Sequence, residues 1–226
     1  MKRYYAEHIK VDIINWICKG HLGFDKNEDA IANEPLYGPK MRRVDLLLIS
    51  SLGLHALEIK SEKDSLSKLS EQISEYTQTF DKTSVVLTKN HLQSAKSILP
   101  KNVGIILVED NSFIELRPAS CHKRLNKKYL TTLLPKPVLL QLVGNQYKKY
   151  DTFQIREIVA PKVSLLQLKT IVIQWLQKKY TRFFQCYLRD VQYGCSIDNL
   201  CMLTLKMPMG FRSGHSSSYN VSLYEY

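Results

Sequence analysis

One group of ionisable residues in the chain has the types and spacing that phosphodiester chemistry needs: Asp45 and, thirteen positions downstream, the triplet Glu58-Ile59-Lys60. Two carboxylates can hold magnesium, which prefers oxygen ligands and keeps several waters. A lysine beside them could orient or deprotonate an attacking water, or neutralise charge that develops on a phosphate. On spacing alone, the alternative is a solvated hairpin face where acid and base pair for little gain.

The segments that carry these residues predict a β-hairpin. Residues 43–49 and 54–60 are short apolar runs, and Ser51-Leu52-Gly53 between them has the composition of a tight turn. A turn centred there places Asp45 opposite Glu58 or one position off. Because side chains alternate along a strand, Glu58 and the lysine two residues later share one face. Two facing carboxylates repel, so the arrangement favours a cation between them.

A helix is expected directly after the hairpin. Its apolar residues recur at steps of three and four, and Asp64 or Ser65 could cap its start. Gln72 and Tyr76 are four residues apart and lie on one face, where an amide and a phenol could hold a phosphate or a base. The alternative is that Tyr76 is a core aromatic and Gln72 a boundary residue. The apolar stripe consists of Leu66, Leu69, Ile73, Tyr76 and Phe80.

Together these motifs resemble a known signature. Asp45, Glu58-Ile59-Lys60 and Gln72-Ile73-Ser74-Glu75-Tyr76 resemble the PD-(D/E)XK motif of restriction-endonuclease-like nucleases, with the Gln-x-x-x-Tyr extension of RecB-type members. The wider run from Arg43 to Lys82 is similar to a small, poorly characterised bacterial and phage family of such proteins. The resemblance covers residues 1–117. Val44 stands in place of the proline of the motif, which many active members also lack.

The resemblance implies a nuclease that depends on Mg²⁺ or Mn²⁺ and hydrolyses phosphodiester bonds, with DNA as the expected substrate. It assigns Asp45 and Glu58 as metal ligands and Lys60 as the catalytic lysine. Glu34 is a weaker metal candidate, for which Glu28 and Asp29 compete. The alternative is a nucleic-acid-binding adaptor of the same fold that acts without catalysis in a larger complex. The catalytic set implied in this way is Asp45, Glu58, Lys60, Gln72 and Tyr76.

The fold class expected is α/β, with a mixed central sheet flanked by helices in the order α-β-β-α-β-α-β. Residues 3–19 have mostly helical apolar spacing and are expected to form an opening helix that ends near Gly20. After the central helix, the patterns predict strands at 83–88 and 103–108, a helix from His91 to Ile98 that Asn90 could cap, and an edge strand at 112–116.

Charge favours a polyanionic partner. The 226-residue chain has 32 Lys and Arg against 21 Asp and Glu, a net charge of +11. No acid occurs between Glu115 and Asp151, or from Ile158 to Arg189. Aromatics in the second stretch could stack on unpaired bases or could belong to the core; they are Trp175, Tyr180, Phe183, Phe184 and Tyr187. The nucleic-acid-binding candidates are Arg43, Lys123, Arg124, Lys127, Lys128, Lys178, Lys179 and Arg182.

Two regions are predicted: a nuclease-like core at 1–117, and a basic, mainly helical accessory region at 118–226 whose end, 210–226, is a loose tail. A helix interrupted at Pro135 and Pro137 is expected at 129–143, and one or two amphipathic helices at 163–190. Five cysteines without Cys-x-x-Cys pairs predict free thiols. With no signal core and no run of ~20 apolar residues, we expect a cytoplasmic protein without a membrane partner. A homodimer and a partner protein both stay open.

Overall fold

The computed structural model describes residues 5–109, 112–191 and 197–205. Within them, a mixed sheet has the strand order β1-β4-β5-β6-β7-β8. Neighbouring strands are antiparallel from β1 to β5, parallel from β5 to β7 and antiparallel from β7 to β8. The coarse α/β prediction is confirmed. The strands are β1 Ala30–Asn33, β4 Leu46–Ser50, β5 Gly53–Lys60, β6 Lys82–Thr88, β7 Gly104–Glu109 and β8 Ser112–Arg117.

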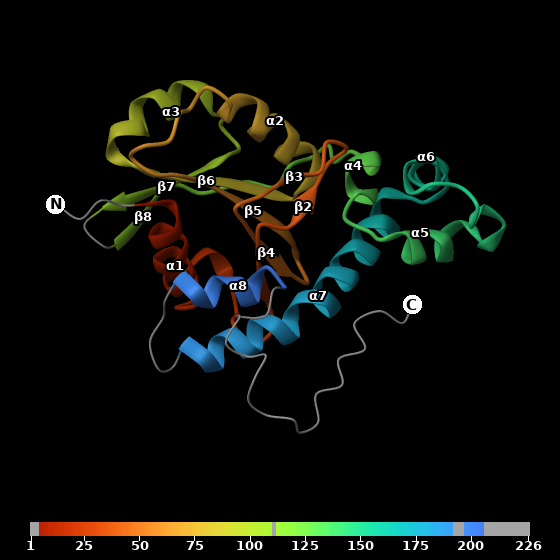
Figure 1. Cartoon of the computed structure of the whole chain (residues 1–226). Helices are drawn as coiled ribbons and strands as arrows, with labels where there is room; N and C mark the ends of the chain where they lie inside the picture. Colours follow the sequence, from red (N-terminus) through yellow and green to blue (C-terminus); the bar gives the residue numbers. More distant parts are fainter. Residues whose placement is uncertain (1–4, 110–111, 192–196, 206–226) are drawn as a thin grey trace.

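Helices cover both faces of this sheet (Figure 1). Helices α2 (Leu69–Thr79) and α3 (Leu92–Ile98) form the crossovers between the parallel strands and lie on one face. Helices α1 (Ala6–Ile17), α7 (Leu165–Asp190) and α8 (Leu200–Leu203) lie on the other. The opening helix is confirmed: its isoleucines are buried, and Gly20 follows it with a left-handed φ of 95°.

The central helix starts later than predicted. Helix α2 begins at Leu69, and its N-cap position, Lys68, makes no side-chain capping bond. Asp64 instead accepts hydrogen bonds from the backbone N–H and the hydroxyl of Ser61, at 2.7 and 2.6 Å. The prediction that Asp64 or Ser65 caps this helix is therefore wrong, because the Asp64 carboxylate closes the turn after β5. Asn90 likewise is not the cap of α3, which follows a 3₁₀ turn, η2 (Lys89–His91).

A small hairpin leads from β1 to Asp45. Its strands are β2 (Leu36–Tyr37) and β3 (Arg42–Arg43). Gly38 in its turn has a φ of 70°, and its N–H donates to Thr132 Oγ1 at 2.8 Å. The run predicted as one strand at 43–49 is thus divided between β3 and β4, and Asp45 lies in the break.

The second half of the chain is helical where it is described. Helices α4 (Lys127–Thr131) and α5 (Lys136–Val143) are separated near Pro135, as predicted. The interruption predicted at Pro137 is wrong, because this proline lies in the first turn of α5, where a helix tolerates it. Helix α6 (Thr152–Lys162) was not predicted. The single helix α7 packs against β1 and β4. One hydrophobic core therefore includes residues from both sides of the boundary predicted at 117. The remaining 3₁₀ turns are η1 (His21–Gly23), η3 (Asn145–Tyr147) and η5 (Ile197–Asn199).

Burial decides the role of several aromatics on α7. Tyr180, Phe184 and Tyr187 are 4% exposed or less. The core alternative is confirmed for these three, so they cannot stack on bases. Trp175 is half-buried against the same core. The predicted loose tail at 210–226 lies outside the described residues.

The four cysteines in the described part of the chain are free thiols: Cys18, Cys121, Cys186 and Cys201. Cys195 lies outside that part. Of the described helices, none combines the length and apolar character needed to cross a membrane.

Candidate active site

The hairpin register brings Asp45 and Glu58 to the same position of neighbouring strands. Leu46 pairs with Leu57 across β4 and β5, so Asp45, one residue earlier, lies opposite Glu58, one residue later. Asp45 Oδ2 also accepts a hydrogen bond from the N–H of Ile59 at 2.7 Å. The predicted juxtaposition of the two acids is confirmed.

Glu58 is the centre of a hydrogen-bonded network. Its side chain is only 3% exposed. Lys60 Nζ donates to Glu58 Oε1 at 2.7 Å, and the Tyr76 hydroxyl donates to Glu58 Oε2 at 2.6 Å. Lys60 Nζ also donates to Gln72 Oε1 at 3.2 Å. The five residues that the sequence nominated as catalytic therefore meet where the end of β5 faces α2, and each oxygen of the buried carboxylate is satisfied.

The electrostatics of the network favour a cation beside Asp45. Burial, and next the charge of Glu58, raise the pKa of Asp45 to about 7, against the opposing effects of the Ile59 N–H and of Lys10 and Lys60. Burial and then the charges of Glu58 and Asp45 raise the pKa of Tyr76 well above its usual range. Tyr76 is thus a neutral hydrogen-bond donor at ordinary pH.

A second group of charges lies beside Asp45. Lys10 Nζ, on α1, is 2.9 Å from Glu34 Oε1 and 4.0 Å from Asp45 Oδ1. Arg43 Nη1 lies 3.7 Å from Glu34 Oε2 and donates to the Glu34 carbonyl at 3.3 Å. Lys10 therefore lies between Glu34 and Asp45, and the Glu34 carboxylate is already paired with both Lys10 and Arg43. Of its two competitors, Asp29 closes its own loop by accepting from the N–H of Asp25.

Lys10 was missed by the sequence reasoning, although a signal was present. It lies three, four and seven residues before Ile13, Ile14 and Ile17, which places it on the buried stripe of α1. Its side chain is 7% exposed. A buried lysine is expected to pair with an acid. That expectation would have predicted an acidic partner for Lys10, and the partners found are Glu34 and Asp45.

The donor set suits magnesium better than a metal that needs an all-protein cage. Among the described residues, no three His, Cys, Asp or Glu side chains gather in a way that could hold a metal ion. Magnesium commonly takes one or two carboxylates and completes its octahedron with waters. Asp45 and Glu58 supply two carboxylates. Burial, and next the charge of Glu58, raise the pKa of Asp45, and a cation would offset both effects. The residues therefore fit the ion that the sequence implied.

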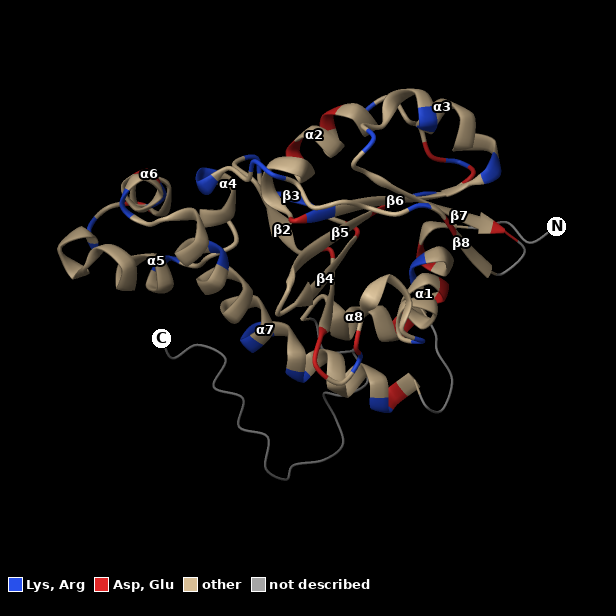
Figure 2. Ribbon diagram, turned by 180° about the vertical axis from the view of Figure 1, so that it is seen from behind, with Lys and Arg blue, Asp and Glu red and all other residues tan. Residues whose placement is uncertain are grey.

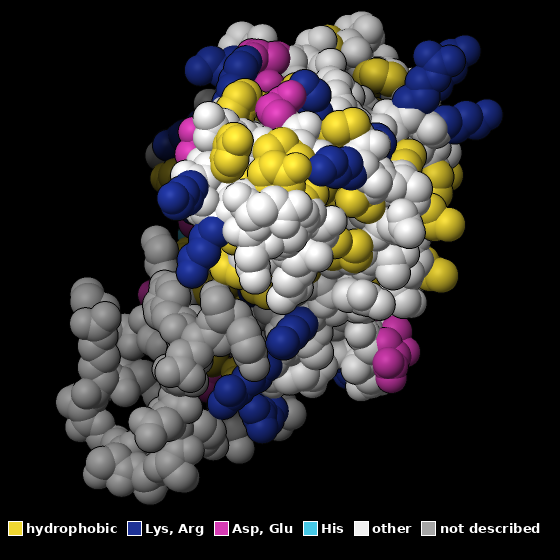
Figure 3. Space-filling view, turned by 90° about the vertical axis from the view of Figure 1, so that its right-hand side faces the viewer, with side chains coloured by type: hydrophobic (Ala, Val, Ile, Leu, Met, Phe, Trp, Pro, Cys, Tyr) yellow, Lys and Arg dark blue, Asp and Glu magenta, His cyan; other side chains and the backbone are white. Residues whose placement is uncertain are grey.

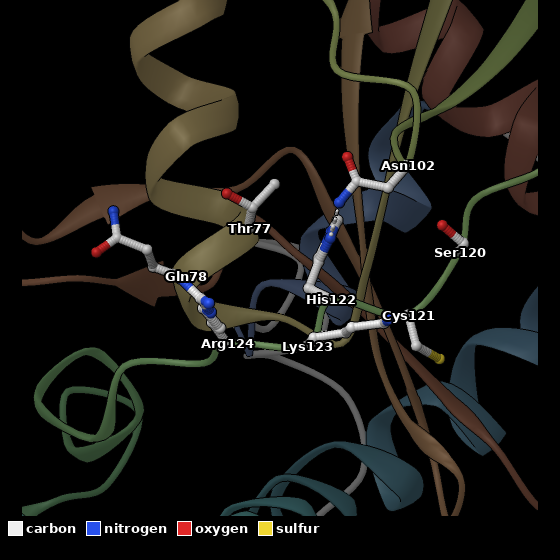
Figure 4. Close-up of a pocket in the computed structure, with 8 residues that line it drawn as sticks. All are labelled: Thr77, Gln78, Asn102, Ser120, Cys121, His122, Lys123 and Arg124. Carbon is white, nitrogen blue, oxygen red and sulfur yellow. Dashed lines mark hydrogen bonds between the residues drawn. The ribbon is translucent and has the colours of Figure 1, made fainter.

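The predicted nucleic-acid-binding residues lie in several places rather than in one patch (Figure 2). Lys123 and Arg124 line a cavity of about 410 Å³ at the C-terminal end of α2 (Figure 4). Lys127 donates to the Val163 carbonyl, and Lys128 forms an ion pair with Glu157. Lys178, Lys179 and Arg182 are exposed on α7. The other residues that line the cavity are Thr77, Gln78, Asn102, Ser120, Cys121 and His122.

Comparison with known proteins places the chain in a phage family. The family model described as "Bacteriophage P4 protein cII" matches residues 1–204. The chain belongs to this family. It is similar to "Protein cII" of Enterobacteria phage P4, with 27% identity over 182 residues that make up 77% of this chain and 67% of the relative. The family match includes both the Asp45–Tyr76 network and helices α4 to α8.

A solved structure gives a weaker likeness. It is a "protein of unknown function" from Silicibacter pomeroyi, SPO1766, which has 14% identity and a TM-score of 0.35 and covers 76% of this chain and 86% of its own. The cII family match, rather than this likeness, is what relates the chain to other proteins.

Proposed function

We propose that this member of the cII family is a nuclease of restriction-endonuclease-like fold that uses Mg²⁺ or Mn²⁺ to hydrolyse phosphodiester bonds, with DNA as its substrate. The observation that supports it most is the network on Glu58: Lys60 and Tyr76 each donate to one oxygen of a carboxylate that lies opposite Asp45. A second support is the order α1-β4-β5-α2-β6-α3-β7, which agrees with the order expected for such nucleases once β1, β2 and β3, inserted between α1 and β4, are left out.

In this proposal, Asp45 and Glu58 would hold the ion. When bound, it would polarise a phosphate oxygen and lower the pKa of a coordinated water. Lys60 has three N–H donors, of which Glu58 and Gln72 each accept one. The third would be available to an attacking water or to a phosphate oxygen. The cationic head of Lys60 would stabilise negative charge that develops on the phosphate.

Gln72 and Tyr76 act in this account as positioning residues. Tyr76 is fully buried, so its hydroxyl fixes the orientation of Glu58 and does not contact substrate. Gln72 fixes the lysine head from the facing helix. Both therefore restrict the geometry of the two groups that would do the chemistry.

The experiment that tests the proposal incubates purified protein with supercoiled, linear and single-stranded DNA and with RNA, in magnesium, in manganese and in chelator. Asp45→Ala and Lys60→Ala are the test variants. Lys89→Ala is the matched control, because Lys89 is an exposed lysine just beyond β6. Metal-dependent cleavage that both test variants lose and the control keeps would support the nuclease. Absence of cleavage on every substrate would reject it for this chain.

One observation favours a second candidate, a non-catalytic nucleic-acid-binding adaptor of the same fold. Lys10 Nζ, 4.0 Å from Asp45 Oδ1, already supplies a positive charge to the acid pair. In an adaptor this lysine would take the place of the metal ion, and DNA binding would be independent of magnesium. Binding that survives both chelator and Asp45→Ala, without cleavage under any condition, is the result that identifies the adaptor.

A further inference from the structure

Helices α5 and α6 and the turn η3 between them form one end of the molecule, beyond α4 (Figure 1). They pack on each other and, through α4, next to α2 and α7. The outer surface of this pair combines aromatic rings and lysines, and we call it the α5–α6 surface. Its residues are Tyr147, Lys148, Lys149, Tyr150, Phe153 and Lys162.

Two of the three aromatic residues of the α5–α6 surface are exposed to solvent, and Tyr147 is half-buried. Phe153 is 65% exposed and Tyr150 43%. Tyr150 meets Tyr147 edge to face, with ring centroids 5.7 Å apart, and Lys162 Nζ lies 4.9 Å above the Tyr147 ring. The aromatics of α7 that the sequence suggested for stacking are largely in the core. Exposed rings suited to contact a ligand are therefore found here.

The charge of the same surface is positive and is not neutralised locally. Lys148 and Lys149 are exposed, and neither has an acidic partner among the described residues. The two acids of this segment are engaged elsewhere: Asp151 caps α6 by accepting from the N–H of Gln154 at 2.8 Å, and Glu157 pairs with Lys128. Figure 3 views the molecule from this end and shows hydrophobic side chains with lysine and arginine side chains, and a smaller number of acidic ones, around them.

We propose that the α5–α6 surface binds single-stranded nucleic acid, with bases stacked on Phe153 and Tyr150 and with phosphates bound by Lys148 and Lys149. Aromatic faces beside unpaired cations are the combination that single-strand-binding proteins use. In a duplex the faces of the bases are stacked on one another, so this surface favours unpaired strands. An apolar protein partner would leave the two lysines without anions at its contact.

This inference deepens the proposed function, because it names an unpaired strand as what the nuclease would hold. It does not require cleavage, since binding is measured in chelator. Protein that binds single strands without cutting them in magnesium would reject the nuclease and leave the α5–α6 surface intact. Protein that cuts DNA but binds it independently of this surface would reject the role of the α5–α6 surface and leave the nuclease proposal intact.

The test measures fluorescence anisotropy of a labelled single-stranded oligonucleotide and of a duplex of the same sequence, in chelator and at several salt concentrations. Phe153→Leu is the central variant, because it keeps an apolar side chain and removes the aromatic face. Single-strand binding should weaken roughly 5- to 100-fold in Phe153→Leu, with a smaller change for the duplex. Leu166→Ala is the control, since Leu166 is 75% exposed on the neighbouring helix but is not aromatic; its affinity should be unchanged.

The lysines are tested by salt dependence. Combining Lys148→Gln and Lys149→Gln removes two phosphate contacts, so the slope of log affinity against log salt should decrease in magnitude by about 1.4, or about 0.7 per contact. The proposal is overturned if Phe153→Leu binds single strands as wild type does, or if duplex and single strand bind equally. It is also overturned if Phe153→Leu abolishes self-association or vesicle binding while single-strand affinity is unchanged.

Discussion

Acidification should destabilise the sheet through His55, a buried residue of β5 whose Nε2 lies 2.9 Å from Ser84 Oγ. Burial, and then the charges of Lys82 and His122, lower the pKa of His55 from its ordinary value of 6.5 to about 3. The unfolded chain takes up a proton on this residue below pH 6.5, whereas the native protein does not until about pH 3. The stability from neutral His55 is therefore complete above pH 6.5 and is lost as the pH falls towards 3.

The size of the effect follows from the separation of the two pKa values. Each pH unit in this window changes the free energy of unfolding by about 1.4 kcal/mol, so the loss between about pH 6.5 and pH 4 is about 3 kcal/mol. Asp45 acts in the opposite direction, because its pKa is raised to about 7 and its native carboxyl gains a proton first. The informative quantity is therefore the difference between wild type and His55→Gln at each pH, in which the contribution of Asp45 cancels.

Urea unfolding followed by tryptophan fluorescence measures this difference, since the chain has two tryptophans. The stability advantage of wild type over His55→Gln should shrink by about 3 kcal/mol between about pH 7 and pH 4. A constant difference across that range would refute the reasoning, because it would mean that native His55 accepts a proton as readily as the unfolded chain.

Two further predictions concern the hydrogen bond from Tyr76 to Glu58 and the close approach of β6 and β7 at Gly104. Tyr76→Phe removes the hydrogen bond to the Glu58 carboxylate and should lower the free energy of unfolding by about 1.5–3 kcal/mol; unchanged denaturant midpoints would contradict the assigned contact. Gly104→Ala would place a Cβ 2.2 Å from Ser84 Oγ and should cost about 1–3 kcal/mol through overpacking, measured by thermal unfolding. Wild-type thermal stability in that variant would show that β6 and β7 can separate without cost.

The pairing of Asp45 with Glu58 could be predicted because it depends on local features. The turn between β4 and β5 needs Gly53, whose φ is 148°, and strand parity then fixes which side chains face each other. The start of α2 could not be predicted in the same way. Asp64 had two local uses, as a helix cap or as an acceptor for Ser61, and the sequence does not decide between them.

The roles of aromatic residues in the second half of the chain were harder to predict, because the same spacing fits both exposed rings and a buried helical stripe. Tyr180, Phe184 and Tyr187 are spaced by four and three residues, which is equally the pattern of a buried helical stripe. Only the packing of α7 on β1 and β4 decides that they are core. Tyr150 and Phe153 carry no periodic signal, since one lies in a turn and the other in the first turn of α6. Their exposure depends on tertiary structure.

We propose that Glu58 and Lys60 form a metal-dependent nuclease site. The most direct test is the rate at which wild type, Glu58→Gln and Lys60→Ala cleave an end-labelled DNA strand in magnesium, with Lys89→Ala as control. Loss of a group that stabilises transition-state charge typically costs about 10²–10³-fold, and loss of a metal ligand removes a contribution of several kcal/mol. We therefore predict at least a roughly 100-fold slower rate in both test variants and an unchanged rate in the control. Cleavage by both test variants at the wild-type rate would show that neither Glu58 nor Lys60 takes part in catalysis.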